Sequence, residues 1–137
     1  MNPDFVWCLS DLGRAYLQTG AHVDAIAAFE RAVSISDGNP YHAGRLAHAQ
    51  AVAGNRTEAL RILAEMNERA EESYVSGLDF AIVYVGLGDN DEAFKRLEEA
   101  YAERVIGLLY ANIDPVFDPI RSDPRFQDLI KRMGLRE

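Results

Sequence analysis

Apolar positions along the chain recur at a fixed interval of 34 residues. In the first stretch, residues 9–32, they stand three, four and seven residues apart, which is the spacing of one face of an α-helix. The same spacing returns twice. The positions in register are Leu12, Leu46 and Phe80; Tyr16, Gln50 and Tyr84; Ala25, Ala59 and Ala93; and Phe29, Leu63 and Leu97. An interval of this length indicates an array of helical repeats.

Each repeat is predicted to hold two helices. Gly20, Gly54 and Gly88 stand in register and separate the two helices, because a helix commonly ends in a residue with positive φ. Gly13 lies inside the first helix, where glycine costs about 0.5–1 kcal/mol relative to alanine, and so predicts a close approach of the second helix. The expected N-caps are Asn2, Asn39, Thr57, Ser73 and Asp91. No strand is expected, and the predicted core holds Leu12, Tyr16, Phe29, Leu46, Leu63, Phe80, Tyr84 and Leu97.

The residues Leu12-Gly13, Tyr16, Ala25 and Phe29 resemble the tetratricopeptide repeat, a helix–turn–helix unit of 34 residues. The resemblance implies an all-α fold, a right-handed superhelix of three helix pairs closed by a C-terminal helical cap. The expected boundaries, within a single domain over residues 1–137, are repeats at 5–38, 39–72 and 73–106 and a cap at 107–137. Three positions depart from the family pattern: Leu9 replaces its early tryptophan, Gln50 replaces an aromatic residue, and Asp37, Glu71 and Val105 stand at its late proline position. The alternative to this family is an ordinary helical bundle.

The last thirty residues leave the repeat pattern. Pro115 must end any helix that begins near Leu108, and Asp-Pro pairs follow at 114, 118 and 123. The third repeat has apolar residues where the first two have polar ones, so we expect residues 105–135 to fold back over it. The predicted contacts of this cap are Val75, Leu78, Ile82, Phe117, Phe126 and Leu129. The tail is similar to tails that close repeat regions in bacterial regulators, which suggests the C-terminal part of a larger signalling protein.

In the tetratricopeptide family the first helices line a concave groove. Carried over in register, that groove would present Trp7, Ser10, Asp11, Arg14, Gln18, Tyr41, Arg45, His48, Val52 and Asp79. Arg14, Arg45 and His48 could grip a carboxylate, and Trp7 and Tyr41 are residue types that dominate binding hot spots. The alternative is that the two arginines pair internally with Asp11 and Asp79. The resemblance therefore implies a protein- or peptide-binding module; the alternative function is self-association as a homodimer, through the groove or an end face.

Charge and composition bear on the partners that this chain could bind and on its cellular location. The net charge is −8, and residues 65–103 carry all of it, with eleven acids against three bases. An acidic surface repels the phosphate backbone, so binding to nucleic acid is disfavoured. The segment is interpreted either as a solvated helix face or as a binding surface for a basic partner. No apolar run approaches the ~20 residues of a membrane span, and no secretory signal is evident. Cys8 stands alone, which indicates a reducing cytoplasm, and is expected to be buried.

The sequence holds no pattern of a catalytic or cofactor site. There is no phosphate-binding loop, nucleophile elbow or His-Glu-x-x-His motif. The three histidines, His22, His42 and His48, do not form a pair at i, i+4, and the single cysteine cannot complete a zinc site. We therefore expect no enzymatic activity, no cofactor and no metal.

Overall fold

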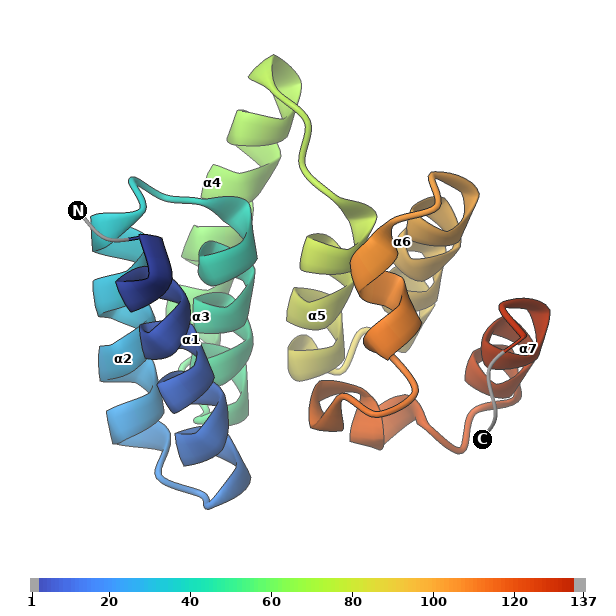
Figure 1. Ribbon diagram of the computed structural model, residues 1–137, viewed down its shortest axis with the longest axis horizontal. Helices are drawn as coiled ribbons and strands as arrows, with labels where there is room; N and C mark the ends of the chain where they lie inside the picture. Colours follow the sequence, from blue (N-terminus) through green and yellow to red (C-terminus); the bar gives the residue numbers. More distant parts are fainter. Residues whose placement is uncertain (1–2, 135–137) are drawn as a thin grey trace.

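The computed structural model describes residues 3–134, and all regular structure within this range is helical, as the sequence predicts (Figure 1). Six α-helices come first, and two short 3₁₀ helices and a last α-helix form the tail. Their bounds are α1 (Pro3–Gln18), α2 (His22–Ile35), α3 (Pro40–Val52), α4 (Arg56–Glu72), α5 (Gly77–Leu87), α6 (Asn90–Ala102), η1 (Ile106–Tyr110), η2 (Pro115–Ile120) and α7 (Pro124–Arg132).

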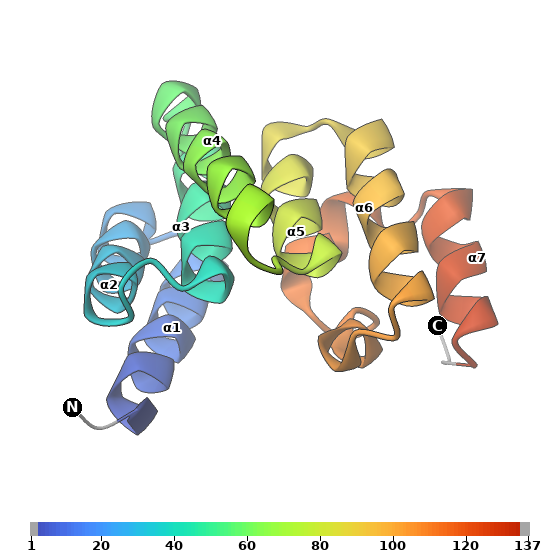
Figure 2. The same cartoon turned by 90° about the horizontal axis from the view of Figure 1, so that it is seen from above.

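Consecutive helices pack as pairs, α1 on α2, α3 on α4 and α5 on α6. Helix α3 joins the pairs, because it packs on α2 at one side and on α5 at the other. Seen from above, the pairs form a row with α1 and α2 at one end and α6 and α7 at the other (Figure 2). Most inner helices are therefore covered by a neighbour on each side, whereas α1 stands at an end.

The turns inside the pairs follow the sequence prediction. Gly20, Gly54 and Gly88 have φ of 79°, 91° and 80°, the left-handed conformation in which a side chain would be strained. Gly13 faces Phe29, and a Cβ at Gly13 would lie 2.8 Å from the aromatic ring. The predicted close approach of α1 and α2 is therefore confirmed.

Of the predicted N-caps, Asn39 is confirmed, since its side chain accepts a hydrogen bond from the Tyr41 amide at 2.9 Å. Thr57 and Asp91 are wrong by two residues. Helices α4 and α6 begin directly after the glycine turn, with Asn55 and Asp89 at their N-cap positions. A left-handed glycine reverses the chain so tightly that the next residue is already the N-cap of the second helix.

The cap predicted at Ser73 is also wrong. Helix α4 continues through Glu72, so Ser73 ends it, and Ser76 caps α5 by accepting a hydrogen bond from the Leu78 amide at 3.1 Å. Asn2 lies outside the described residues.

Five of the eight residues expected in the core are buried: Phe29, Leu46, Leu63, Phe80 and Leu97. Tyr16 and Tyr84 are half-buried. The prediction for Leu12 is wrong, because its side chain is 46% exposed, and Cys8 is exposed as well. Both lie on a face of α1 that no helix pair of the described residues covers. The repeat position of Leu12 is therefore buried in the middle of the row, at Leu46 and Phe80, and exposed at its end.

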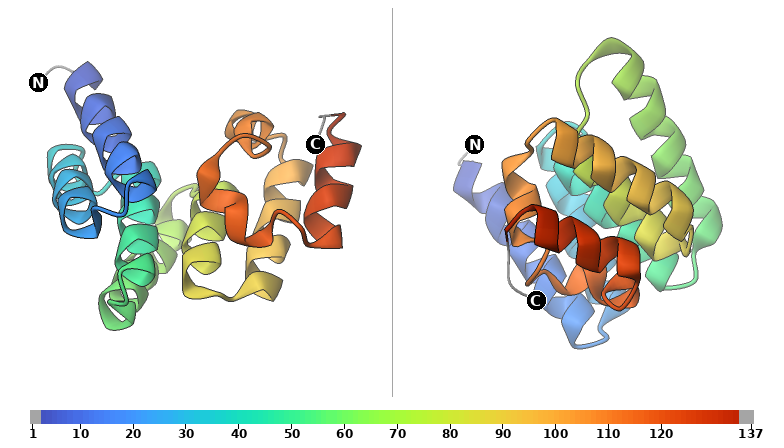
Figure 3. Two further views of the ribbon diagram at one scale, coloured as in Figure 1. Left: turned by 90° about the horizontal axis from the view of Figure 1, so that it is seen from below. Right: turned by 90° about the vertical axis from the view of Figure 1, so that its right-hand side faces the viewer.

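The tail folds back onto α5 and α6 and shares one apolar core with them. This core contains Ala81, Ile82, Val85, Ala93, Phe94, Leu97, Ala100, Leu108, Ala111, Val116, Phe117, Ile120, Phe126, Leu129 and Ile130. Helix α7 lies on the outer side of α6, away from α1 and α2 (Figure 3). The tail thus covers the C-terminal end of the row.

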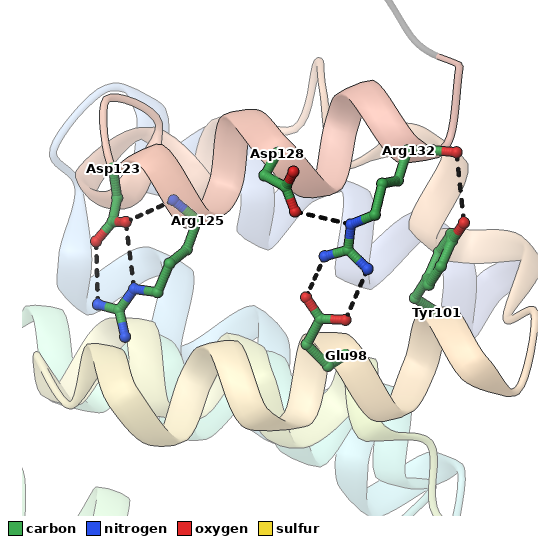
Figure 4. Close-up of polar contacts among 6 residues, drawn as sticks. All are labelled: Glu98, Tyr101, Asp123, Arg125, Asp128 and Arg132. Atoms are coloured by element: carbon green, nitrogen blue, oxygen red, sulfur yellow. Dashed lines mark hydrogen bonds and ion pairs between the residues drawn. The ribbon is translucent and has the colours of Figure 1, made fainter.

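Charged groups hold α7 against α6 (Figure 4). The Arg132 guanidinium pairs with Glu98 on α6 and with Asp128 at 2.8 Å, and the Tyr101 hydroxyl donates to the Arg132 carbonyl at 3.4 Å. Arg125 likewise reaches Asp91 at 2.8 Å. Part of the acid-rich segment therefore faces basic residues of the same chain.

Candidate binding cleft

A cleft of about 470 Å³ opens between helices α1 and α3 on one side and η2 on the other. Its lining residues are Arg14, Leu17, Gln18, Arg45, His48, Val52, Asp114, Pro115, Val116, Asp118 and Pro119. The α1 and α3 residues stand three, four and seven positions apart, so each helix presents one face to the cleft. The tail supplies the opposite wall, which the repeat pattern by itself did not contain.

Asp114 of the tail forms an ion pair with Arg45, one of the two arginines that the sequence analysis assigned to ligand binding. Its Oδ2 atom lies 3.0 Å from Arg45 Nη2 and 3.7 Å from Arg14 Nη2. Its Oδ1 atom accepts a hydrogen bond from the Val116 amide at 3.0 Å. The side chains of Arg45 and Asp114 are only 8% and 10% exposed, so this ion pair is buried.

The electrostatics follow from that geometry. Burial alone would raise the pKa of the Asp114 carboxyl, but the charge and hydrogen bond of Arg45, with the Val116 amide and Arg14, lower it below its usual value. Burial raises the pKa of Asp79 to about 6, although the charge of Arg45 opposes this shift. Within residues 3–134, Arg45 Nε is buried without a hydrogen-bond partner, so the guanidinium is not fully satisfied.

Internal pairing of the arginines therefore takes a form that the sequence did not predict. Arg14 does lie 3.7 Å from Asp11 and keeps a third of its side chain exposed. Arg45 makes its hydrogen bond to Asp114, 69 positions away, rather than to Asp79. Asp114 was not identified as a site residue from the sequence, because an aspartate that precedes a proline indicates only a helix cap.

Besides Arg45, two of the expected groove residues are buried. Ser10 is fully buried, with its Oγ atom 2.5 Å from His42 Nδ1. His48 is buried as well, and its Nδ1–H donates to the Ile82 carbonyl at 3.1 Å. Burial lowers the pKa of His48 to about 4, so its ring is neutral at neutral pH and brings no positive charge to the cleft.

An aromatic pair lies beyond the arginines on the same faces of α1 and α3. The Trp7 and Tyr41 rings have centroids 4.8 Å apart, and the Arg45 guanidinium lies 5.4 Å from the Tyr41 ring. Trp7 is 48% exposed although it is the largest side chain in the chain. Trp7, Asp11, Arg14 and Gln18 follow one another at helical spacing, so the aromatic pair and the cleft form one continuous strip.

The predicted cap contacts fall into two cores. Ile82, Phe117, Phe126 and Leu129 lie in the core that the tail shares with α5 and α6, and Leu78 packs against it. Val75 packs instead against the core formed by α2, α3, α4 and α5.

Within the described range, no group of three or more His, Cys, Asp or Glu side chains is placed to hold a metal ion. No helix between residues 3 and 134 is long and apolar enough to cross a membrane.

Comparison with known proteins gives one family. The family described as tetratricopeptide repeat matches residues 16–79, from the last turn of α1 to the first turn of α5. No significant match to a curated protein or to a solved structure was found. Residues 16–79 are thus similar in sequence to the tetratricopeptide repeats, and the paired helices are in keeping with that family.

Proposed function

We propose that the chain is a protein- or peptide-binding module built from three tetratricopeptide-type helix pairs, at 5–38, 39–72 and 73–106, in a right-handed superhelix. The family match over residues 16–79 and the row of helix pairs support this proposal. Repeat arrays of this kind bind proteins on an extended concave surface. The tail, residues 107–137, closes the array and confines binding to the first two pairs.

The observation that carries the proposal is the strip on α1 and α3. It joins an aromatic pair, the exposed Trp7 and the half-buried Tyr41, to Arg14, whose side chain is 34% exposed. From Trp7 to Gln18 the strip is roughly 16 Å long, at 1.5 Å per helical residue. An extended peptide of about five residues spans that length. The aromatic rings would bind an apolar side chain, and Arg14 would bind an acidic side chain or a C-terminal carboxylate.

Selection of peptides from a random library on the purified protein, followed by fluorescence polarisation, tests the proposal. Trp7→Ala should weaken the selected peptides by about thirtyfold or more, as expected for a hot-spot residue worth 2 kcal/mol. Arg14→Glu should remove the preference for acidic peptides. Leu60→Ala is the matched control, because Leu60 is an exposed apolar residue on α4, outside the strip.

Circular dichroism must show unchanged helicity for all three variants. Peptides that bind Trp7→Ala and Arg14→Glu as tightly as the unmodified chain would place the binding site elsewhere and refute the proposal.

The setting of the module is part of the same proposal. The similarity of the tail to those of bacterial regulators favours a cytoplasmic signalling protein in which the module recruits a partner. Self-association is the second candidate, because one end of the row carries uncovered apolar side chains.

A further inference from the structure

The outer face of α1 carries an apolar stripe that is open to solvent. Phe5, Cys8, Leu12 and Ala15 stand at i, i+3, i+7 and i+10, and all four are exposed. Phe5 and Leu12 are 39% and 46% exposed. This spacing repeats every 3.5 residues, which is the pattern of a helix that packs lengthwise against another helix. We call these four residues the α1 stripe.

Two register positions of the stripe, those of Leu12 and Ala15, are buried in the other two pairs. Leu12 corresponds to Leu46 and Phe80, which are 6% and 2% exposed. Ala15 corresponds to Ala49 and Val83, both fully buried. All four of these residues belong to the core that joins the pairs. The Leu12 and Ala15 part of the α1 stripe is therefore equivalent to the surface by which the other pairs pack on a neighbour, and the described residues place no helix pair over it.

The two ends of the row differ in this respect. At the C-terminal end, α7 buries Phe126, Leu129 and Ile130 and adds the Arg132–Glu98 ion pair. At the α1 end, the described residues place no helix over the stripe, and only the Arg31 guanidinium of α2 reaches it, 5.0 Å from the centre of the Phe5 ring. Helix α1 even begins earlier in its repeat than α3 does, which adds Phe5 to the stripe where the next repeat has the polar Asn39.

We propose that two copies of this chain associate through the α1 stripe, with the two α1 helices antiparallel about a two-fold axis that crosses the stripe midway between Cys8 and Leu12. In this arrangement Phe5 of one copy lies opposite Ala15 of the other, and Cys8 lies opposite Leu12. Each layer then pairs a large side chain with a small one, so the stripe is complementary to itself. A two-fold interface requires this self-complementarity.

Charge is compatible with this pairing. Helix α1 contains two acids and one base, Asp4, Asp11 and Arg14, whereas the acid-rich segment 65–103 runs from α4 of the second pair to the end of α6. Asp11 flanks the stripe, and Arg14 lies 3.7 Å from it, which reduces repulsion between the two Asp11 carboxylates. The proposed interface therefore keeps the main negative charges of the two copies apart.

The size of the interface sets its strength. Four side chains from each copy bury less than the roughly 1,200–2,000 Å² of a stable specific complex. We therefore expect a reversible dimer that forms at high micromolar concentration, with both clefts left open because the strip lies on another face of α1.

Sedimentation equilibrium from micromolar to near-millimolar concentration tests the proposal. The unmodified chain should dimerise, and Leu12→Glu should weaken the dimer by about a hundredfold or more, because two carboxylates would be buried without partners. Val23→Glu is the matched control, since Val23 is an exposed apolar residue on α2, outside the stripe. It should leave the dimer unchanged.

The alkylation rate of Cys8 locates the interface independently. It should fall with rising protein concentration for the unmodified chain and for Val23→Glu, but stay constant for Leu12→Glu. A chain that remains monomeric throughout overturns the proposal. So does a dimer that survives Leu12→Glu, or one that leaves Cys8 equally reactive at every concentration, because the contact would then lie elsewhere.

Discussion

Replacing Asp114 by alanine tests whether the tail is fastened to the repeats by its buried carboxylate. The change leaves Arg45, whose side chain is 8% exposed, as a buried cation without its hydrogen-bonded carboxylate. Removing one partner of a buried ion pair typically costs 3–5 kcal/mol, roughly, because the remaining charge stays desolvated. It also removes the hydrogen bond from the Val116 amide that caps η2.

The expected loss translates into a melting temperature. Unfolding entropy near 2.1 cal/mol/K per residue gives about 290 cal/mol/K for this chain, so each kcal/mol lowers the midpoint by about 3.5 °C. Asp114→Ala should therefore melt about 10–17 °C below the unmodified chain. Differential scanning calorimetry at pH 7 measures both the midpoint and the enthalpy.

Two further variants isolate the cause. Asp118→Ala is the matched control, because Asp118 also precedes a proline on η2 but is 65% exposed and pairs at the surface with Arg121. It should cost less than about 1 kcal/mol. Replacing Asp114 and Arg45 together by apolar residues should restore most of the loss, since no unpaired charge remains. If Asp114→Ala melts within about 3 °C of Asp118→Ala, the ion pair does not fasten the tail and the reasoning fails.

Four further variants test the packing and the buried titratable groups. Gly13→Ala should lose about 1–3 kcal/mol in urea unfolding despite the better helix propensity of alanine, because the new Cβ would lie 2.8 Å from the buried ring of Phe29; unchanged stability would contradict the close approach. The pKa of Asp79 is about 6 in the folded state, against 3.8 as its ordinary value, so its contribution to folding stability is complete below pH 3.8 and is lost as the pH rises through 6. Asp79→Asn should therefore raise the free energy of unfolding at pH 7. The pKa of His48 is about 4 in the folded state, against 6.5 as its ordinary value, so its contribution to folding stability is complete above pH 6.5 and is lost as the pH falls toward 4. The stability of His48→Gln should therefore fall less in acid than that of the unmodified chain. Chemical unfolding from pH 4 to 7 checks both signs. A chain ended at Glu103 should melt lower and bind more of a dye for apolar surface, because the core it shares with the tail becomes exposed; an unchanged melt and dye signal would show that the tail is dispensable.

The sequence by itself determined the local structure of the repeats. Helix spacing and the three turn glycines act over a few residues, so the pairs and their turns were predictable from the 34-residue interval. Cap positions were less secure, since Asn55 and Asp89 start their helices two residues before the predicted caps. That error arises because the tightness of a glycine turn, rather than cap chemistry alone, sets the first helical residue.

Only the tertiary structure decided what the candidate site contains. Asp114 meets Arg45 across 69 positions, and no local pattern places that tail residue beside α3. Likewise Leu12 and Leu46 hold the same place in the repeat, yet one is exposed and the other is buried. They differ because a neighbouring helix pair lies against Leu46 and not against Leu12. The burial of a side chain, its ion pairs and its pKa all depend on such neighbours. A residue and its spacing in the sequence do not specify them.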